Sequence, residues 1–232
     1  MNKLLLCIFL LSNAVCFKEE DVDVFVFSRT IDANQPMIAL TFDDGPYPAV
    51  TRRIVNALLE NNSRATFFQL GSRMEEHEAF VLQMAKDGMQ IGNHTYTHVI
   101  PNIHNIQQCL SELNQTSDIM QRVLGEQRYA IRTPGGAYND ALLAGINGPI
   151  ILWSIDTLDW KYQDSQRIVN QILAEVSDGD IVLMHDLYET TAEACEMLIP
   201  ELIKRGYQLV TVEELFYYKG IVVEDHVLYR HG

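Results

Sequence analysis

The hexapeptide Thr41-Phe42-Asp43-Asp44-Gly45-Pro46 closes an apolar run that begins at Met37. A short apolar run that ends in a turn signal predicts a buried strand. Asp-Asp-Gly-Pro by itself is also typical of an ordinary surface turn. The stretch therefore predicts two adjacent carboxylates, Asp43 and Asp44, at the carboxyl end of a strand.

A second motif is His94-Thr95-Tyr96-Thr97-His98. Two histidines at this spacing can present their imidazoles to one metal ion if the backbone turns helically there. A histidine pair at this spacing is also common on a solvated helix face. Its occurrence together with the Asp43-Asp44 doublet favours a site that combines a metal ion with a general base.

Strand-like and helix-like segments alternate along the chain with short connections. Strands are predicted over Asp23–Phe27, Met37–Phe42, Ala65–Leu70, Met89–Gly92, Tyr129–Arg132, Ile150–Ile155, Ile181–Met184 and Gln208–Val212. Helices are predicted over Arg52–Asn61, Met74–Lys86, Ile106–Val123, Ser165–Val176, Thr191–Lys204 and Val212–Tyr218. The repeated strand–helix order implies an α/β fold with a parallel sheet, and about seven such units predict a distorted (β/α) barrel.

The length and composition fit one secreted domain. At 232 residues and 47% apolar, the chain can bury a full core without a second domain. A basic start, an apolar run over residues 4–11 and small residues before Cys16 predict a signal peptide over residues 1–17. The apolar run is shorter than the ~20 residues that span a bilayer, so a membrane anchor is not expected. Residues 18–232 are then the single functional domain.

Polar residues follow several of the predicted strands at their carboxyl ends. They are Asp43, His94, Arg132, Asp156 and His185. Barrel enzymes assemble their active sites from loops at this end of the strands. A solvated loop would explain any one of these residues, but so many titratable groups in equivalent places predict one converging site.

These motifs resemble those of the NodB-homology polysaccharide deacetylases, which form carbohydrate esterase family four. Three further motifs follow in the family's order, namely Arg132-Thr133-Pro134, Asp156-Thr157-Leu158-Asp159-Trp160 and Leu183-Met184-His185-Asp186. The resemblance extends from about Met37 to Leu215. The family includes chitin deacetylases, peptidoglycan N-acetylglucosamine deacetylases and acetylxylan esterases. The resemblance therefore implies the family's barrel fold and the hydrolysis of acetyl groups on a glycan.

The resemblance assigns a metal site and a base to particular residues. Asp44, His94 and His98 are expected to hold one divalent ion, with Zn²⁺ as the expected metal, since two imidazoles and a carboxylate are a common ligand set for catalytic zinc. Asp43 is expected to act as the general base that takes a proton from the attacking water. Arg132 is expected to orient Asp43 and keep it ionised. A surface salt bridge is the alternative explanation for Arg132.

The resemblance also assigns roles to residues on the opposite side of the scissile bond. His185 is expected to be the general acid that protonates the departing amine. Asp159 is expected to hold the imidazole of His185 and raise its pKa. Trp160 and Leu183 would line the pocket for the acetyl methyl group, although both are also plausible core residues.

One motif position departs from the family pattern. Gly135 stands where the family has Tyr or Phe after Arg-x-Pro, and Gly136 follows it. The backbone amide that helps to stabilise the oxyanion in the family survives this change, but the ring that shapes the groove is lost. Two adjacent glycines also make the loop more mobile. Gly135 is therefore expected to affect turnover rather than metal binding.

Charge and motifs narrow the candidate partners. With 31 acidic and 17 basic residues the formal charge is −14, which argues against nucleic acid or an anionic membrane as a partner. The expected partner is an acetylated glycan such as chitin or a peptidoglycan-like wall polymer, and the expected location is secreted or at the cell wall. The leading hypothesis is N-deacetylation of an N-acetylglucosamine polymer. Two alternatives stay open, a wall-binding family member with little turnover and an O-acetyl (xylan) esterase.

Overall fold

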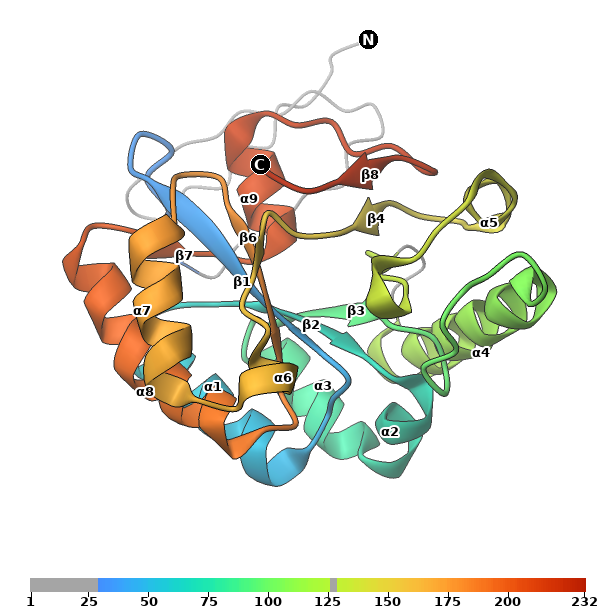
Figure 1. Ribbon diagram of the computed structural model, residues 1–232, viewed down its shortest axis with the longest axis horizontal. Coiled ribbons are helices and arrows are strands. Elements are labelled where there is room, and N and C mark those ends of the chain that lie inside the picture. The colour runs from blue at the N-terminus through green and yellow to red at the C-terminus, as the bar shows by residue number, and fades with distance from the viewer. Residues whose placement is uncertain (1–28, 126–128) are drawn as a thin grey trace, which may run out of the picture.

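The computed structural model describes residues 29–125 and 129–232. The predicted signal peptide and the predicted strand Asp23–Phe27 lie outside these residues. Figure 1 shows a twisted sheet at the centre of the molecule with helices along its outside. The last helix and the last strand lie together at the end of the molecule that carries the C-terminus.

A parallel sheet forms the centre of the fold. Its strand order is β3-β2-β1-β6-β5, and β7 pairs with the first residues of β1. The strands are β1 (Met37–Asp43), β2 (Thr66–Gln69), β3 (Gln90–Asn93), β5 (Ile155–Asp156), β6 (Ile181–His185) and β7 (Gln208–Leu209). β2 pairs with residues 41–43 of β1 and β7 with residues 37–38, so these two strands follow one another along one edge of β1.

Single bridges continue the sheet beyond β3. Ile131 forms parallel bridges with Asn93 and with Ile150. Ile150 belongs to β4 (Ile150–Ile151), which pairs in parallel with β8 (Leu228–Tyr229). The order β5-β6-β1-β2-β3-Ile131-β4-β8 therefore bends into a distorted α/β barrel, which confirms the predicted fold class.

Three predicted strands and one predicted helix differ in the structure. The strand expected over Gln208–Val212 is shortened to Gln208–Leu209, and Val212 begins α9. The strand expected over Tyr129–Arg132 is reduced to the one-residue bridge at Ile131. The strand expected over Ile150–Ile155 is divided into β4 and β5. The helix expected over Met74–Lys86 is divided at His77 into α2 and α3.

The division between β4 and β5 has a physical cause. The carbonyl oxygens of Ile151 and Leu152 both accept hydrogen bonds from the buried side chain of Arg132. Carbonyls of a regular strand bond to the neighbouring strands instead. The chain therefore leaves the sheet after Ile151 in order to turn two successive carbonyls toward one guanidinium.

Helices surround the sheet (Figure 1). They are α1 (Pro48–Glu60), α2 (Gly71–Glu76), α3 (Glu78–Lys86), α4 (Ile106–Leu124), α5 (Asp140–Gly145), α6 (Asp159–Tyr162), α7 (Ser165–Glu175), α8 (Glu189–Lys204) and α9 (Val212–Lys219), with a 3-10 turn η1 (Pro134–Gly136). The short helices α5 and α6 were not predicted, because they are too short to show a helical apolar period. No described helix combines the length and the apolar character that crossing a lipid bilayer requires.

The core fixes the ends of the strands, where the candidate residues lie. All seven residues of β1 are buried. Phe42 of β1 stacks on Phe67 of β2 with 4.9 Å between ring centroids. On α7, Ile168, Val169 and Ile172 form a buried apolar stripe. Close packing of this kind leaves the strand ends little freedom to move.

Candidate active site

The predicted metal ligands come together at the ends of β1 and β3. Asp44 directly follows β1, and His94 directly follows β3. Asp44 Oδ1 lies 3.4 Å from His94 Nε2 and 3.3 Å from His98 Nε2. The three ligand atoms all lie within 4.8 Å of one another. The structure therefore joins the two sequence motifs in one cluster.

The histidine pair lies on a bent loop rather than on the helical turn that its spacing suggests. Thr95 and His98 have positive φ angles of 68° and 67°. Asn93 fixes the bend, because its Oδ1 atom accepts a hydrogen bond from the Thr95 amide at 2.9 Å. His94 Nδ1 lies 2.7 Å from the carbonyl oxygen of Arg132, so Nε2 is the nitrogen that faces the cluster.

The cluster fits a divalent cation. Asp44 Oδ1 is buried without a hydrogen-bond partner, although two imidazoles face it. Burial by itself raises the pKa of Asp44, but the imidazoles of His94, His98 and His185 outweigh it and lower the pKa to about 2. The carboxylate is therefore ionised. Two imidazole nitrogens and an ionised carboxylate oxygen around one point suit zinc and similar divalent ions.

Asp43 ends β1 beside the cluster and is held by Arg132. Arg132 Nη1 donates to Asp43 Oδ1 at 2.8 Å, while the Nε and Nη2 atoms of Arg132 donate to the carbonyls of Ile151 and Leu152, both at 2.9 Å. Asp43 Oδ2 lies 3.7 Å from His94 Nε2. Arg132 is fully buried, which excludes a surface salt bridge. Burial lowers the pKa of Arg132, and the charge of Asp43 opposes that shift.

His185 ends β6 next to Asp43, since the two residues are register partners on neighbouring strands. Its Nδ1 atom lies 2.7 Å from Asp159 Oδ1. Asp159 Oδ2 accepts hydrogen bonds from the His185 amide at 2.8 Å and from the Thr191 hydroxyl at 2.7 Å. Burial lowers the pKa of His185, but the hydrogen bond and charge of Asp159 outweigh it and raise the pKa to about 9. The imidazole is therefore protonated at neutral pH.

Two further carboxylates, Asp156 and Asp186, support loops beside the site. Asp156 Oδ1 accepts a hydrogen bond from the Leu158 amide at 2.9 Å. Asp186 Oδ2 accepts one from the Thr51 hydroxyl at 2.6 Å, and burial raises the pKa of Asp186 to about 7. Sequence reasoning missed Thr51 and Thr191, because a single threonine in a helix gives no local signal of such a role.

The glycine of the first motif is required by the packing of Asp186. A Cβ atom at Gly45 would lie 2.1 Å from Asp186 Oδ2 and 2.4 Å from Asp186 Oδ1. Any side chain at this position would therefore displace the carboxylate. The contact locks the loop that carries Asp43 and Asp44 against the end of β6.

The segment after Arg132 leaves one edge of the site open. Gly135 and Gly136 in η1 both have a φ angle of +63°. A Cβ atom at Gly135 would meet no described atom within 4 Å, whereas one at Gly136 would lie 2.8 Å from the ring of Trp153. There is space for a side chain at Gly135, but its left-handed backbone disfavours residues other than glycine.

The predicted pocket residues Trp160 and Leu183 lie on the His185 side of the site. Leu183 belongs to β6, two residues before His185, and is buried. Trp160 follows Asp159 in α6 and is 49% exposed. Trp160 is therefore not a core residue, whereas Leu183 is almost wholly covered.

The chain matches known proteins over most of its length. Residues 30–147 match the family described as polysaccharide deacetylase. The peptidoglycan-N-acetylmuramic acid deacetylase PdaC of Bacillus subtilis is 39% identical over 187 residues, which are 81% of this chain and 40% of PdaC. A peptidoglycan-N-acetylglucosamine deacetylase of Bacillus cereus is 34% identical over 194 residues, which are 80% of this chain and 91% of that protein. The chain thus spans less than half the length of PdaC.

Solved structures of relatives have the same architecture. The structure of PdaC from Bacillus subtilis superposes with a TM-score of 0.78 at 38% identity, covering 82% of this chain and 94% of that chain. A family 4 acetyl xylan esterase from Clostridium thermocellum, in complex with a cobalt ion, superposes with a TM-score of 0.79 at 28% identity, covering 84% of this chain and 98% of that chain. Sequence and structure agree, and the chain belongs to the polysaccharide deacetylase family.

Proposed function

We propose that the protein is a metal-dependent deacetylase that hydrolyses the N-acetyl groups of a wall glycan, with peptidoglycan as the first candidate and chitin as the second. The observation that carries this proposal is the pairing of Asp43 with His185. The two are register partners at the ends of β1 and β6, and each is held by an oppositely charged partner. Amide hydrolysis needs such a base and such an acid on either side of the scissile bond.

Asp44, His94 and His98 would hold one divalent ion, for which Zn²⁺ is the best candidate. When bound, the ion supplies Lewis-acid chemistry that polarises the acetyl carbonyl. The buried and unpartnered Asp44 Oδ1 supports this assignment. Elemental analysis of the purified protein beside a His94→Ala His98→Ala variant tests it, and equal metal content in both proteins would contradict it.

Asp43 would take the proton from the attacking water. Arg132 holds the Oδ1 atom of Asp43, so Oδ2 is the oxygen directed at the cluster. The buried guanidinium keeps the carboxylate oriented. Arg132 is therefore a positioning residue, since it acts through Asp43 rather than on the substrate.

His185 would donate a proton to the departing amine. Asp159 binds Nδ1, so Nε2 is the nitrogen that delivers the proton. Because the pKa is raised to about 9, the proton is present at neutral pH. Trp160 and Leu183 would border the acetyl methyl group, and the Gly135 amide would donate to the developing oxyanion.

The proposed place of action is outside the cell, at the wall. PdaC and the Bacillus cereus relative are both named as peptidoglycan deacetylases. Residues 1–17 have the composition of a signal peptide. We propose that residues 18–232 form one catalytic domain that meets its glycan after this leader is removed.

Two other functions each have an observation in their favour. The Clostridium thermocellum structure, which superposes with a TM-score of 0.79, is an acetyl xylan esterase, so O-deacetylation of xylan is an alternative for the same site. The open edge at Gly135 favours a wall-binding protein with little turnover, because the ring that the family places there is absent.

Acetate release from a panel of substrates separates these three functions. The metal-loaded protein is incubated with peptidoglycan fragments, chitin oligosaccharides and acetylated xylan. We expect release from the N-acetylated glycans. Release from xylan alone would establish the esterase instead. Metal binding without release from any glycan, together with unchanged glycan binding by Asp43→Asn, would establish the wall-binding function.

A further inference from the structure

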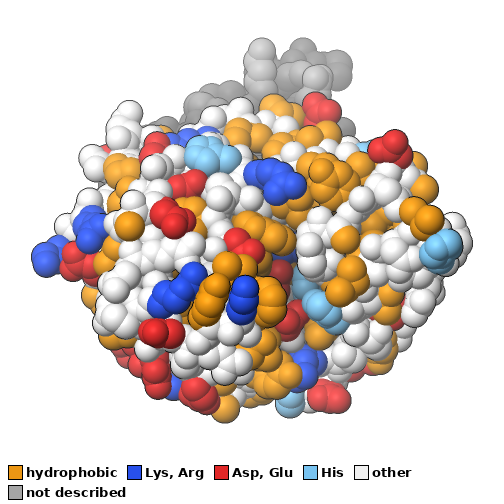
Figure 2. Space-filling view, in the orientation of Figure 1, with side chains coloured by type: hydrophobic (Ala, Val, Ile, Leu, Met, Phe, Trp, Pro, Cys, Tyr) orange, Lys and Arg blue, Asp and Glu red, His pale blue; other side chains and the backbone are white. Residues whose placement is uncertain are grey.

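A row of aromatic and basic side chains extends from the candidate site along α6 and the start of α7. Trp160, Lys161 and Tyr162 follow Asp159 directly and are exposed, Trp160 by 49% and Tyr162 by 47%. Figure 2 shows hydrophobic and basic side chains next to one another over these elements, near histidine and acidic side chains in the middle of this face. Since Asp159 holds His185, the row begins at the catalytic machinery itself.

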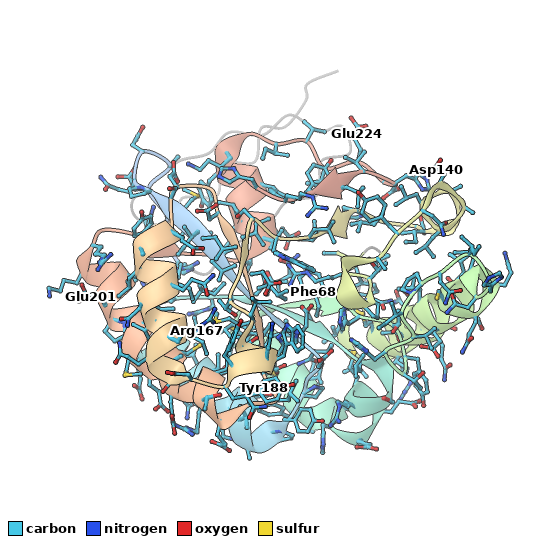
Figure 3. All side chains as sticks on the ribbon, in the orientation of Figure 1. Phe68, Asp140, Arg167, Tyr188, Glu201 and Glu224 are labelled. Carbon is cyan, nitrogen blue, oxygen red and sulfur yellow. The ribbon has the colours of Figure 1, made fainter. Side chains whose placement is uncertain are left out.

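Two cations, Lys161 and Arg167, lie over the ring of Tyr162. The guanidinium carbon of Arg167 lies 3.9 Å from the ring centroid of Tyr162, and Lys161 Nζ lies 5.1 Å from it. Arg167 Nη1 also donates to the Thr157 carbonyl at 2.9 Å, which fixes the guanidinium. Figure 3 shows Arg167 on the side of α7 that faces α6. The two positive charges are therefore held at defined places beside the site.

These cations have no acidic partner of their own among the described residues. The ion pairs of the structure place Arg53, Arg122 and Arg205 beside glutamates, but none involves Lys161 or Arg167. The nearby carboxylate of Asp164 accepts the backbone N–H of Arg167 as a helix cap. In a chain with a formal charge of −14, two unpaired cations on one aromatic ring form a local anion-attracting patch.

We propose that Lys161 and Arg167, held by Tyr162, form a carboxylate-binding subsite that makes the protein prefer acidic glycans over neutral ones. The proposal rests on the proposed deacetylase function and specifies its substrate class. A guanidinium binds carboxylates through two parallel N–H donors, and an ammonium adds charge. The net charge of the chain repels an anionic glycan elsewhere, so a local cationic patch is what such a substrate needs.

Peptidoglycan offers carboxylates from two sources, and chitin offers neither. The lactyl ether of a muramic acid unit carries one where no peptide is attached to it. Where a peptide is attached through that carboxyl group, the carboxylates of the peptide take its place. Both sources present the same group, a carboxylate, so four probes are needed to tell them apart. They are glycan chains with free lactyl carboxylates, the same chains with those carboxylates amidated, peptide-bearing fragments and chitin oligosaccharides of equal length.

Calorimetric binding to the metal-loaded protein tests the subsite independently of turnover. Lys161→Gln and Arg167→Gln are compared with wild type and with Lys204→Gln, which removes the same charge from a 79% exposed side chain at the C-terminal end of α8. We expect each subsite variant to raise the Kd for the acidic fragments by about 5-fold at low salt and less at high salt. The rise in Kd for chitin oligosaccharides should be at least threefold smaller. Lys204→Gln should bind every probe as wild type does.

The outcomes distinguish this proposal from the proposed function. If wild type binds the amidated chains as weakly as Lys161→Gln binds the chains with free lactyl carboxylates, the lactyl group is the carboxylate recognised. If the rise in Kd is confined to the peptide-bearing fragments, the peptide is the carboxylate recognised. Equal losses on acidic and neutral probes would overturn the subsite, whether or not acetate is released. Selective binding without acetate release from any glycan would keep the subsite and overturn the deacetylase.

Discussion

The two ion pairs at the ends of β1 and β6 are built in opposite ways. In Arg132–Asp43 the cation is the buried support, and the carboxylate faces the cluster. In Asp159–His185 the carboxylate is the buried support, and the imidazole faces the cluster. The same kind of pair therefore presents a negative group on one strand and a positive group on its neighbour.

Both supports are fixed by several hydrogen bonds. Arg132 also donates to the Ile151 and Leu152 carbonyls, and Asp159 also accepts from the Thr191 hydroxyl. A buried charge is tolerated only where its hydrogen bonds are satisfied in this way. In both pairs the buried support therefore carries the charge opposite to that of the group that faces the cluster.

The largest effect is expected when the carboxylate of Asp43 is removed. We expect Asp43→Asn to lower acetate release by about 10³-fold, because the amide cannot accept the proton from water. Metal content, measured by elemental analysis, should stay at the wild-type level, since Asp44, His94 and His98 are unchanged. Turnover above a tenth of wild type would mean that another group is the base.

Removing a support should affect the fold as well as the site. We expect Arg132→Gln to lower the free energy of unfolding by about 3–5 kcal/mol, because the carboxylate of Asp43 is left buried without its partner. Urea denaturation measures the change. The control is Arg53→Gln, whose ion pairs with Glu189 and Glu196 lie at the surface and contribute at most about 1 kcal/mol. Equal losses in the two variants would contradict the supporting role.

The second support, Asp159, should set the alkaline pH limit of activity. As the proposed general acid, His185 must be protonated, so we expect activity to be lost as the pH rises through its pKa of about 9. We expect Asp159→Asn to move this alkaline limit of kcat/KM toward the ordinary value of 6.5, because the opposing charge is gone. A pH–rate profile measures the shift. Asp156→Asn, which removes the same charge from the neighbouring strand end β5, should leave the limit in place.

The same pKa shift has a stability consequence with a defined sign. The pKa of His185 is higher in the folded protein than the ordinary value of 6.5, so its contribution is fully present below pH 6.5 and is lost as the pH rises through about 9. Asp159→Asn should therefore reduce Tm more at pH 6 than at pH 10. A loss that is the same at both pH values would mean that Asp159 stabilises the fold without its charge.

The smallest effect is expected at Gly135, outside both pairs. We expect Gly135→Tyr to raise acetate release without changing metal content, because a ring would narrow the open edge and fix the adjacent amide. It should also lower stability by about 1–2 kcal/mol, since φ is +63° there. Gly135→Ala carries the same backbone strain without a ring. If the two variants release acetate equally, the open edge does not limit the rate.

The sequence by itself determined the positions of the strand ends and the motifs on them. The apolar runs that precede Asp43 and His185 predict β1 and β6, because burial of a short apolar segment depends on local composition. The family motifs then identify Asp44, His94 and His98, which the structure brings within 4.8 Å of one another.

Only the tertiary structure decided how these residues are held. Arg132 bonds to Asp43 across 89 positions of sequence, and Asp186 bonds to Thr51 across 135. No local period signals a partner at such a distance. The division of the strand predicted over Ile150–Ile155 arises in the same way, because the buried guanidinium of Arg132 binds the carbonyls of Ile151 and Leu152.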